Sequence, residues 1–187
     1  MNEDDLINEF MKDDGFLNWF DSINEFNSPI PKELHSVYSE GPFAKCDGCN
    51  KSLLSPPKFY EIQKVYRYGE VVFEYAICNQ CGENLSREYS KESIENLQQH
   101  FFEHCQLFSL EKNCIICQKE QNKLKEYSSI GICKGDRLFY NLFICQECTD
   151  NIESLLSEKT KRIMGDFIDN KFPGVPEHLT PAPLLQI

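Results

Sequence analysis

Positive charge is scarce in this chain. Lysine and arginine contribute 19 residues against 30 aspartates and glutamates, so the formal net charge is -11 at pH 7. Binding to a phosphate backbone depends on cationic side chains that release counterions, and this acidic balance disfavours nucleic acid as a partner. A local basic face can still occur on an acidic protein. Its best candidates are Lys58, Lys64 and Arg67 around the first predicted hairpin.

Long apolar runs are also missing. A membrane-spanning helix needs about 18 or more consecutive apolar residues, and the chain has no such run. Its first residues, Met1 to Asp5, show neither the basic nor the apolar region of a secretory leader. We therefore expect a cytoplasmic protein without a membrane partner. In a reducing compartment, paired cysteines favour metal binding over disulfide bonds.

Cysteine, by contrast, occurs in an ordered pattern. Eight of the ten cysteines form four C-x-x-C pairs, and one such pair places two thiolates on a tetrahedral cation from a single turn. The first two pairs are separated by 28 residues and the last two by 27, which indicates an internal duplication of one zinc-binding unit. We expect two structural zinc ions and sequential pairing, with a cross-brace of the first and third pairs as the alternative. The predicted ligands are Cys46, Cys49, Cys78 and Cys81 for one ion and Cys114, Cys117, Cys145 and Cys148 for the other.

The same order of secondary structure is predicted in both units. Lys58 to Ile77 is rich in Tyr, Phe, Val and Ile and is interrupted at Gly69, while Ser129 to Ile144 is interrupted at Gly135; both patterns are typical of β-hairpins. After each hairpin and its cysteine pair, apolar residues at helical spacing predict one closing helix. The apolar faces are Ile94, Leu97, Phe101, Cys105 and Phe108 in the first unit, and Ile152, Leu155, Leu156, Ile163, Phe167 and Ile168 in the second.

The order of C-x-x-C turn, hairpin, second cysteine pair and helix resembles the treble-clef zinc finger. The resemblance implies that the last two ligands of each unit come from the start of a helix. Amide groups at a helix start also stabilise thiolates, and zinc bound by four thiolates carries a formal charge of about -2. The expected fold class is therefore α+β, with two tandem zinc-stabilised units behind an acidic helical segment.

The two ends of the chain, outside the two zinc-binding units, form separate segments. Apolar residues at three- and four-residue steps predict two short amphipathic helices broken near Gly15. They either cover the first unit or dock on a basic partner through Phe10, Trp19 and Phe20. The C-terminal tail contains several prolines and should be extended, either along the protein's own surface or towards a partner. The predicted segments are 1–40 (acidic), 41–110 (first unit), 111–172 (second unit) and 173–187 (tail).

One further motif suggests chemistry. His100, Glu103 and His104 match H-x-x-E-H, in which two histidines bind zinc and the glutamate acts as a general base of a peptidase. The simpler interpretation is a set of polar residues on the exposed side of a helix, because such a peptidase needs a further carboxylate ligand and a deep cleft. An additional metal site built from His100, His104 and Cys105 is a third interpretation. Otherwise Cys105 and Cys133 are expected to be small buried residues.

Four sulfur ligands saturate a zinc ion and leave no position for water or substrate. The sequence therefore predicts a protein that is not an enzyme, namely a zinc-binding protein-interaction module that acts as an adaptor or as an acidic inhibitor or immunity-type binder of a basic partner. A nucleic-acid-binding tandem zinc-finger protein is the alternative, and a metal-dependent peptidase is the third hypothesis.

Overall fold

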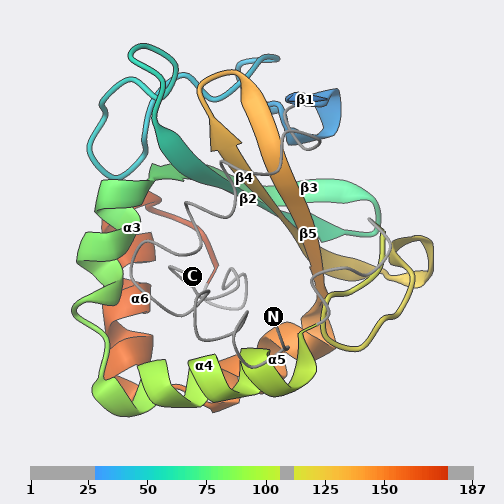
Figure 1. The fold of residues 1–187 in the computed structure, drawn as a ribbon, viewed down its shortest axis with the longest axis vertical. Helices are drawn as coiled ribbons and strands as arrows, with labels where there is room; N and C mark the ends of the chain where they lie inside the picture. Colours follow the sequence, from blue (N-terminus) through green and yellow to red (C-terminus); the bar gives the residue numbers. More distant parts are fainter. Residues whose placement is uncertain (1–27, 106–111, 177–187) are drawn as a thin grey trace, which may run out of the picture.

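An antiparallel sheet of five strands forms the centre of the molecule (Figure 1). This computed structural model describes residues 28–105 and 112–176, and the docking residues predicted in the N-terminal helices and the apolar end of the tail lie outside that part. Within it the fold is mixed α and β, with strand order β1-β5-β4-β2-β3 and four α-helices. The strands are β1 (Ser28–Pro29), β2 (Phe59–Arg67), β3 (Glu70–Cys78), β4 (Glu126–Lys134) and β5 (Arg137–Cys145).

Both predicted hairpins are confirmed. Strands β2 and β3 pair with each other, as do β4 and β5, and each pair is joined by a two-residue turn. The turns need positive φ, which is 85° at Gly69 and 58° at Gly135. Glycine adopts this conformation without a steric penalty, so the interruptions seen in the sequence are the hairpin turns.

The two hairpins join edge to edge through β2 and β4. Their antiparallel ladder runs over nine residue pairs, and Gln63 lies opposite Ile130 at its centre. Position 130 is 67 residues after 63, which is also the step from Cys78 to Cys145 (145 − 78 = 67). The central residue of β2 therefore pairs with its own equivalent in the second repeat. The duplicated units are arranged about an approximate twofold axis and share one sheet.

Residues 28–40 are built into this fold. Strand β1 pairs with β5, and the short 3-10 helix η2 (Lys32–Leu34) brings Leu34 onto the sheet, where it is 1% exposed. A Cβ atom at Gly131 would lie 2.8 Å from Leu34 Cδ1, so this close approach requires glycine on β4. The C-terminal part of the stretch assigned to the acidic segment is thus in contact with the second repeat.

The prediction of one closing helix per unit is wrong, because each unit ends in two helices. The break follows from two serine caps: Ser90 Oγ accepts from the backbone N–H of Ser93, and Ser157 Oγ accepts from that of Thr160. Such caps satisfy amides that have no partner inside the helix. The four helices are α3 (Asn79–Ser86), α4 (Lys91–His104), α5 (Gln146–Ser154) and α6 (Glu158–Lys171).

The two capping serines also hold the repeats together. Ser90 Oγ and Ser157 Oγ are 2.8 Å apart. The backbone N–H of Ser90 donates to Thr160 Oγ1, and that of Ser157 donates to Ser93 Oγ. Each helix start is therefore capped partly by the other repeat, on the same approximate twofold axis as the β2–β4 ladder.

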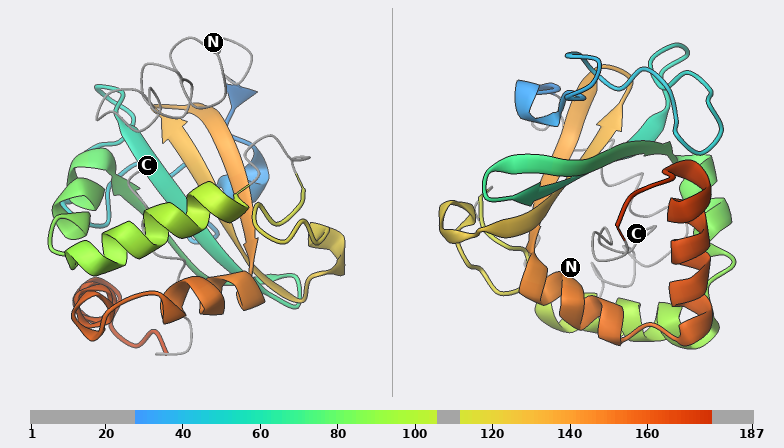
Figure 2. Two further views of the ribbon diagram at one scale, coloured as in Figure 1. Left: turned by 60° about the horizontal axis from the view of Figure 1, so that its bottom comes forward. Right: turned by 180° about the vertical axis from the view of Figure 1, so that it is seen from behind.

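The four helices lie on one side of the sheet, whereas η2 lies on the other (Figures 1 and 2). Phe172, just beyond α6, packs edge-on against Phe73 of β3, with ring centroids 5.1 Å apart. On the opposite side, Leu34, Leu53 and Ile62 belong to the same buried cluster. The sheet is therefore covered on both faces, and the two repeats contribute to a common core.

Glu61 of β2 is a buried carboxyl group with a testable pH dependence. Burial raises its pKa to about 7, although a hydrogen bond from Gln63 Nε2 to Glu61 Oε1 (2.8 Å) opposes the shift. The folded state then binds the proton more tightly than the unfolded state does. The protonated carboxyl group therefore stabilises the folded state. This stabilisation is complete below pH 4.5, the ordinary pKa of a glutamate, and is lost as the pH rises through about 7.

We therefore expect Glu61→Gln to stabilise the protein at alkaline pH relative to the wild type. The difference between the two unfolding free energies should grow in favour of the variant by about 2 kcal/mol between pH 5 and pH 8. Denaturant titrations at both pH values, with zinc in excess, measure this difference. Parallel pH profiles for the two proteins would contradict the assignment.

Candidate metal centres

Two tight turns supply the first cysteine pair of each group. In the first, the Cys46 N–H donates to Lys51 O and the Asn50 N–H donates to Cys46 O; in the second, Cys114 and Gln118 make the equivalent bonds. Asn50 and Gln118 both have a φ of 60° directly after the second cysteine. This left-handed conformation closes each turn, so that both of its sulfur atoms reach the same group.

The second pair comes from the junction of a strand and a helix. Cys78 is the last residue of β3 and the N-cap residue of α3, and Cys145 holds the same position between β5 and α5. Cys81 and Cys148 follow in the first turn of these helices. The Cys78 N–H donates to Cys46 Sγ at 3.2 Å, and the Cys145 N–H donates to Cys114 Sγ at 3.4 Å. Backbone donors therefore face sulfur in both groups, as a negatively charged thiolate cluster requires.

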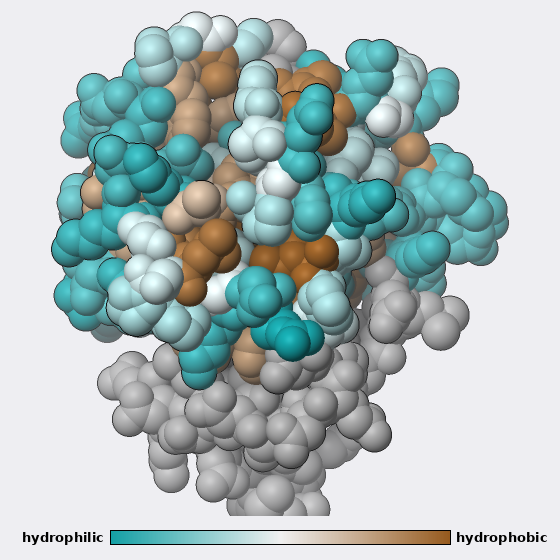
Figure 3. All heavy atoms as spheres, turned by 90° about the horizontal axis from the view of Figure 1, so that it is seen from above, coloured by the Kyte–Doolittle hydropathy of each residue, from teal (hydrophilic) through white to brown (hydrophobic). Residues whose placement is uncertain are grey.

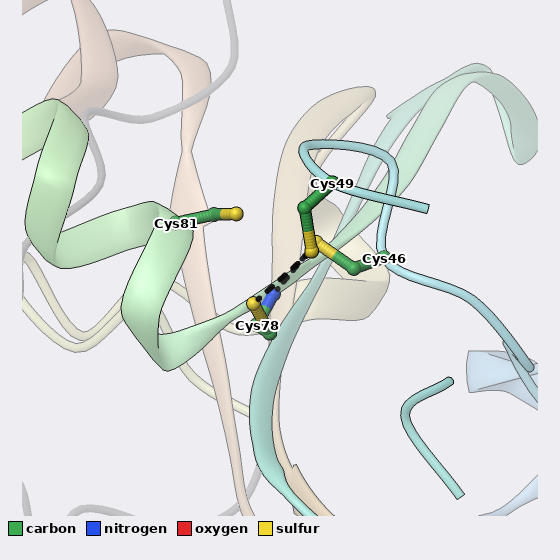
Figure 4. Close-up of side chains that lie close together, drawn as sticks. All are labelled: Cys46, Cys49, Cys78 and Cys81. Carbon is green, nitrogen blue, oxygen red and sulfur yellow. Dashed lines mark hydrogen bonds between the residues drawn. The ribbon is translucent and has the colours of Figure 1, made fainter. Parts of the chain in front are cut away.

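The sulfur atoms lie at metal-binding distances. The four Sγ atoms of each group are within 4.8 Å of one another, with 3.9 Å between Cys49 and Cys78 and 3.6 Å between Cys117 and Cys145 (Figure 4 shows the first group). Tetrahedral zinc with bonds of about 2.3 Å separates its sulfur ligands by about 3.8 Å. All ten cysteines are free, so these contacts are not disulfides. The structure brings the eight predicted ligands together in two sequential groups, each suited to hold a metal ion.

The thiol pKa values show why a cation suits these groups. Burial raises the pKa of Cys46, Cys81 and Cys148, so these thiols resist ionisation without a counter-charge. A hydrogen bond from the Cys145 thiol lowers the pKa of Cys114. Burial opposes ionisation of Cys49, but hydrogen bonds from the Lys51 backbone and neighbouring thiols lower its pKa to about 7. A divalent cation at the centre of four sulfurs would favour the thiolate form of all four.

The two turns differ at both residues between their cysteines, which are Asp47 and Gly48 in the first and Ile115 and Ile116 in the second. A Cβ atom at Gly48 would lie 3.0 Å from both Cβ and Sγ of Cys81. The equivalent position of the second turn is Ile116, whose side chain packs against the second core cluster. Helix α6 also reaches the first turn, because Lys171 Nζ donates to Gly48 O at 2.8 Å. The first turn thus has no room for a side chain at position 48 and is contacted by the second repeat.

The H-x-x-E-H motif does not form a third site within the described residues. The rings of His100 and His104 are 4.8 Å apart on α4, and burial, followed by the neighbouring His104, lowers the pKa of His100. Glu103 accepts a hydrogen bond from Gln99 at 2.9 Å on the same helix. No further ligand joins the two histidines in the part that the structure describes. The thiol of Cys105 is half-buried there, and burial raises its pKa to about 11.

Cys133 has the core position expected of it. Its side chain is fully buried on β4 beside Tyr60, and burial raises the pKa of its thiol to about 12. The hydroxyl of Tyr60 donates to Gly135 O at 2.9 Å. Cys133 is therefore an unreactive thiol at neutral pH.

One of the three basic residues suggested by the sequence is not available to a ligand. Lys64 is buried and paired with Glu74 at 3.1 Å, with each side chain 2% exposed, so it cannot contact a phosphate. Arg67 is paired with Glu126 at 3.6 Å, and Lys58 is half-buried. Sequence reasoning missed the Lys64–Glu74 pair, although the charge-bearing positions lie directly opposite each other in the β2–β3 register.

Comparisons with known proteins return no relative: no protein-family model, no curated protein and no solved structure matches the chain. In the described part of the chain, the longest helices are too short and too polar to cross a membrane. The two cysteine groups and the surface are therefore the features that bear on function.

Proposed function

We propose that the chain is a cytoplasmic, non-enzymatic interaction protein, in which two structural zinc ions hold a duplicated treble-clef-like scaffold. The observation that carries the proposal is that each cysteine group supplies all four ligands of a zinc ion. Each contains four sulfur atoms within 4.8 Å of one another, which is a complete tetrahedral set for zinc. A metal ion saturated in this way has no open position for substrate, so its contribution is to the fold.

The surface supports a protein partner over a nucleic acid. A net charge of -11 disfavours binding to phosphate backbones, and Lys64, one of the three basic candidates, is buried. Apolar patches lie among hydrophilic side chains on the face seen from above in Figure 3. An acidic surface with exposed apolar patches suits a basic protein partner, as for an adaptor or an acidic inhibitor.

The test compares the zinc-loaded chain with Cys148→Ser, which removes one proposed ligand. Elemental analysis should give two zinc ions per wild-type chain and fewer in the variant. Tagged wild-type chain should recover specific proteins from its source cells after nuclease treatment, and Cys148→Ser should not recover them.

A mobility-shift titration against DNA and RNA in rising salt examines the nucleic-acid alternative. We expect no shift at physiological salt. Tight, salt-sensitive binding would overturn the protein-interaction proposal.

A peptidase assay examines the third hypothesis. Peptide hydrolysis by the wild-type chain that is lost in His100→Ala would contradict the proposal that the protein is not an enzyme.

A further inference from the structure

The outer edge of the sheet at β3 carries backbone groups without a partner in residues 28–105 and 112–176. Near its end, β3 is covered: the Ala76 N–H donates to Asp47 Oδ2, and Ala76 O accepts from the Asp47 N–H, each at 2.8 Å. Backbone groups alternate in direction along a strand, so those of Glu74 face the same open side as those of Ala76. No described residue bonds to the Glu74 backbone there. The open edge therefore covers the first half of β3.

The opposite edge of the sheet, at β5, already pairs with a short strand. There, Ser28–Pro29 of β1 pairs with Arg137–Leu138 of β5. The repeat step of 67 maps these β5 residues onto Glu70–Val71 of β3 (137 − 67 = 70; 138 − 67 = 71). Both hairpins also have a bulge at equivalent positions, Val72 and Phe139, and neither residue is paired with a single residue in the register of its hairpin. Since β1 pairs beside the bulge of β5, the bulge of β3 does not prevent a strand from pairing at the same place.

Exposed apolar side chains gather at this edge. Five large apolar side chains are exposed in the described part of the chain, and four of them are here: Val37 (50%), Tyr38 (85%), Tyr68 (74%) and Val72 (37%). Val37 and Val71 also line a hollow of about 500 Å³ between η2 and the sheet. The β3 edge patch, as we define it, consists of Val37, Tyr38, Tyr68, Val71 and Val72.

Tyr68 occupies a backbone position that does not suit tyrosine. Its φ is 50°, and the equivalent residue of the second hairpin is Gly135 (68 + 67 = 135), with a φ of 58°. A left-handed conformation is unfavourable for a residue with a large side chain, whereas glycine adopts it freely. An exposed aromatic residue kept at such a position points to a role outside folding.

The charges around the patch define the chemistry of its partner. Glu33, Glu40 and Glu70 are exposed there, and the first two line the hollow. Lys32 and His35 are the accessible basic residues of that hollow, because Lys64 is buried. The whole chain is also strongly acidic, so pairing of two copies at this edge would bring like charges together. A segment with basic residues fits these charges.

We propose that the β3 edge patch binds an extended segment of a partner protein, with alternating apolar and basic residues, by adding it as a strand next to β3. The inference rests on the proposed interaction function and names its surface. Backbone groups of the segment would bond to those of Val71 and Glu74. Its apolar side chains would contact Val37, Tyr68 and Val72.

The test uses a capped, fluorescent octapeptide of alternating valine and lysine with the full zinc-loaded chain. We expect its binding to shift the backbone amide resonances of residues 70–74 and 37–40. Methylating every second backbone nitrogen of the peptide removes strand hydrogen bonds but keeps the side chains, and should weaken binding at least about 10-fold. Replacing its lysines with glutamate should weaken binding to a similar extent.

Variants of the chain locate the site. Val72→Lys should weaken binding at least about 10-fold, whereas Phe102→Lys, at the fifth exposed apolar residue, should leave it unchanged. Tyr68→Gly should weaken binding without lowering the melting temperature, a combination that loss of structure cannot produce.

Equal binding of the methylated peptide, or resonance shifts away from β3, would overturn the proposal. Dimerisation of the chain in solution that is lost in Val72→Lys would also overturn the proposal, because a second copy of the chain would then occupy the edge. Binding that occurs only after removal of residues 177–187 would assign the edge to the chain's own tail. If the peptides fail while Val72→Lys still recovers the same cellular proteins as the wild type, the interaction function stands and only its assignment to this edge falls.

Discussion

Replacing Cys145 with serine is expected to unfold both halves of the molecule. Cys145 is buried, ends β5, begins α5 and lies 3.6 Å from Cys117 within its group. A structural zinc site contributes about 10–16 kcal/mol of apparent binding energy in small peptides, whereas the net stability of a whole domain is about 5–15 kcal/mol. Loss of one ligand should therefore remove more free energy than the second repeat can spare.

The effect should spread to the first repeat because of the shared sheet. Strand β2 pairs with β4 over nine residue pairs, and the helix caps at Ser90 and Ser157 are completed by each other's repeat. Without β4, the interior strand β2 would become an edge, and the apolar face of the first hairpin would be uncovered. Zinc content should fall below one ion per chain, and the dispersed amide resonances of both hairpins should collapse.

Cys105→Ser is the matched control, since Cys105 belongs to neither group and is half-buried. It should retain two zinc ions and the native spectrum. A Cys145→Ser protein that keeps one zinc ion and a native β2–β3 hairpin would show that the repeats fold independently.

Local features were predictable from the sequence, and long-range pairings were not. The cysteine pairs and the turns at Gly69 and Gly135 depend on residues a few positions apart, so spacing alone identified them. The pairing of Gln63 with Ile130 joins residues 67 positions apart, and nothing in either strand specifies the other. The twofold relation of the repeats is visible only when the sheet is assembled.

Two predictions were wrong, one for a local reason and one for a long-range reason. Helical periodicity continues across Ser90 and Ser157, so the apolar pattern concealed the ends of the helices; the polar sequences at residues 90–93 and 157–160 were the missed signal. Lys64 was interpreted as a surface residue because lysine is seldom buried without a partner. Its partners are Glu74 across the strand pair and the backbone oxygens of Glu33 and His35, which come from a segment far away in the sequence.

Lys64→Met is expected to destabilise the fold by about 3–5 kcal/mol, because it leaves the Glu74 carboxylate buried without its counter-charge. Lys64 Nζ lies 3.1 Å from Glu74 Oε2 and also donates to Glu33 O at 3.0 Å. Glu74 Oε1 accepts from Ser36 Oγ at 2.8 Å and from the Val37 N–H at 2.9 Å. The substitution therefore also loosens residues 33–37 from the sheet.

The double variant Lys64→Met/Glu74→Gln separates the charge from the packing. The introduced glutamine would keep an acceptor for Ser36 and Val37 without a buried charge, so the double variant should be more stable than Lys64→Met alone. Denaturant unfolding with zinc in excess gives the free energies, and the four-protein cycle gives the coupling between the two sites. Lys91→Met serves as the control, because the ion pair of Lys91 with Glu95 is exposed and its loss should leave the unfolding midpoint unchanged. If Lys64→Met behaves like Lys91→Met, the buried pair does not hold the N-terminal segment on the sheet.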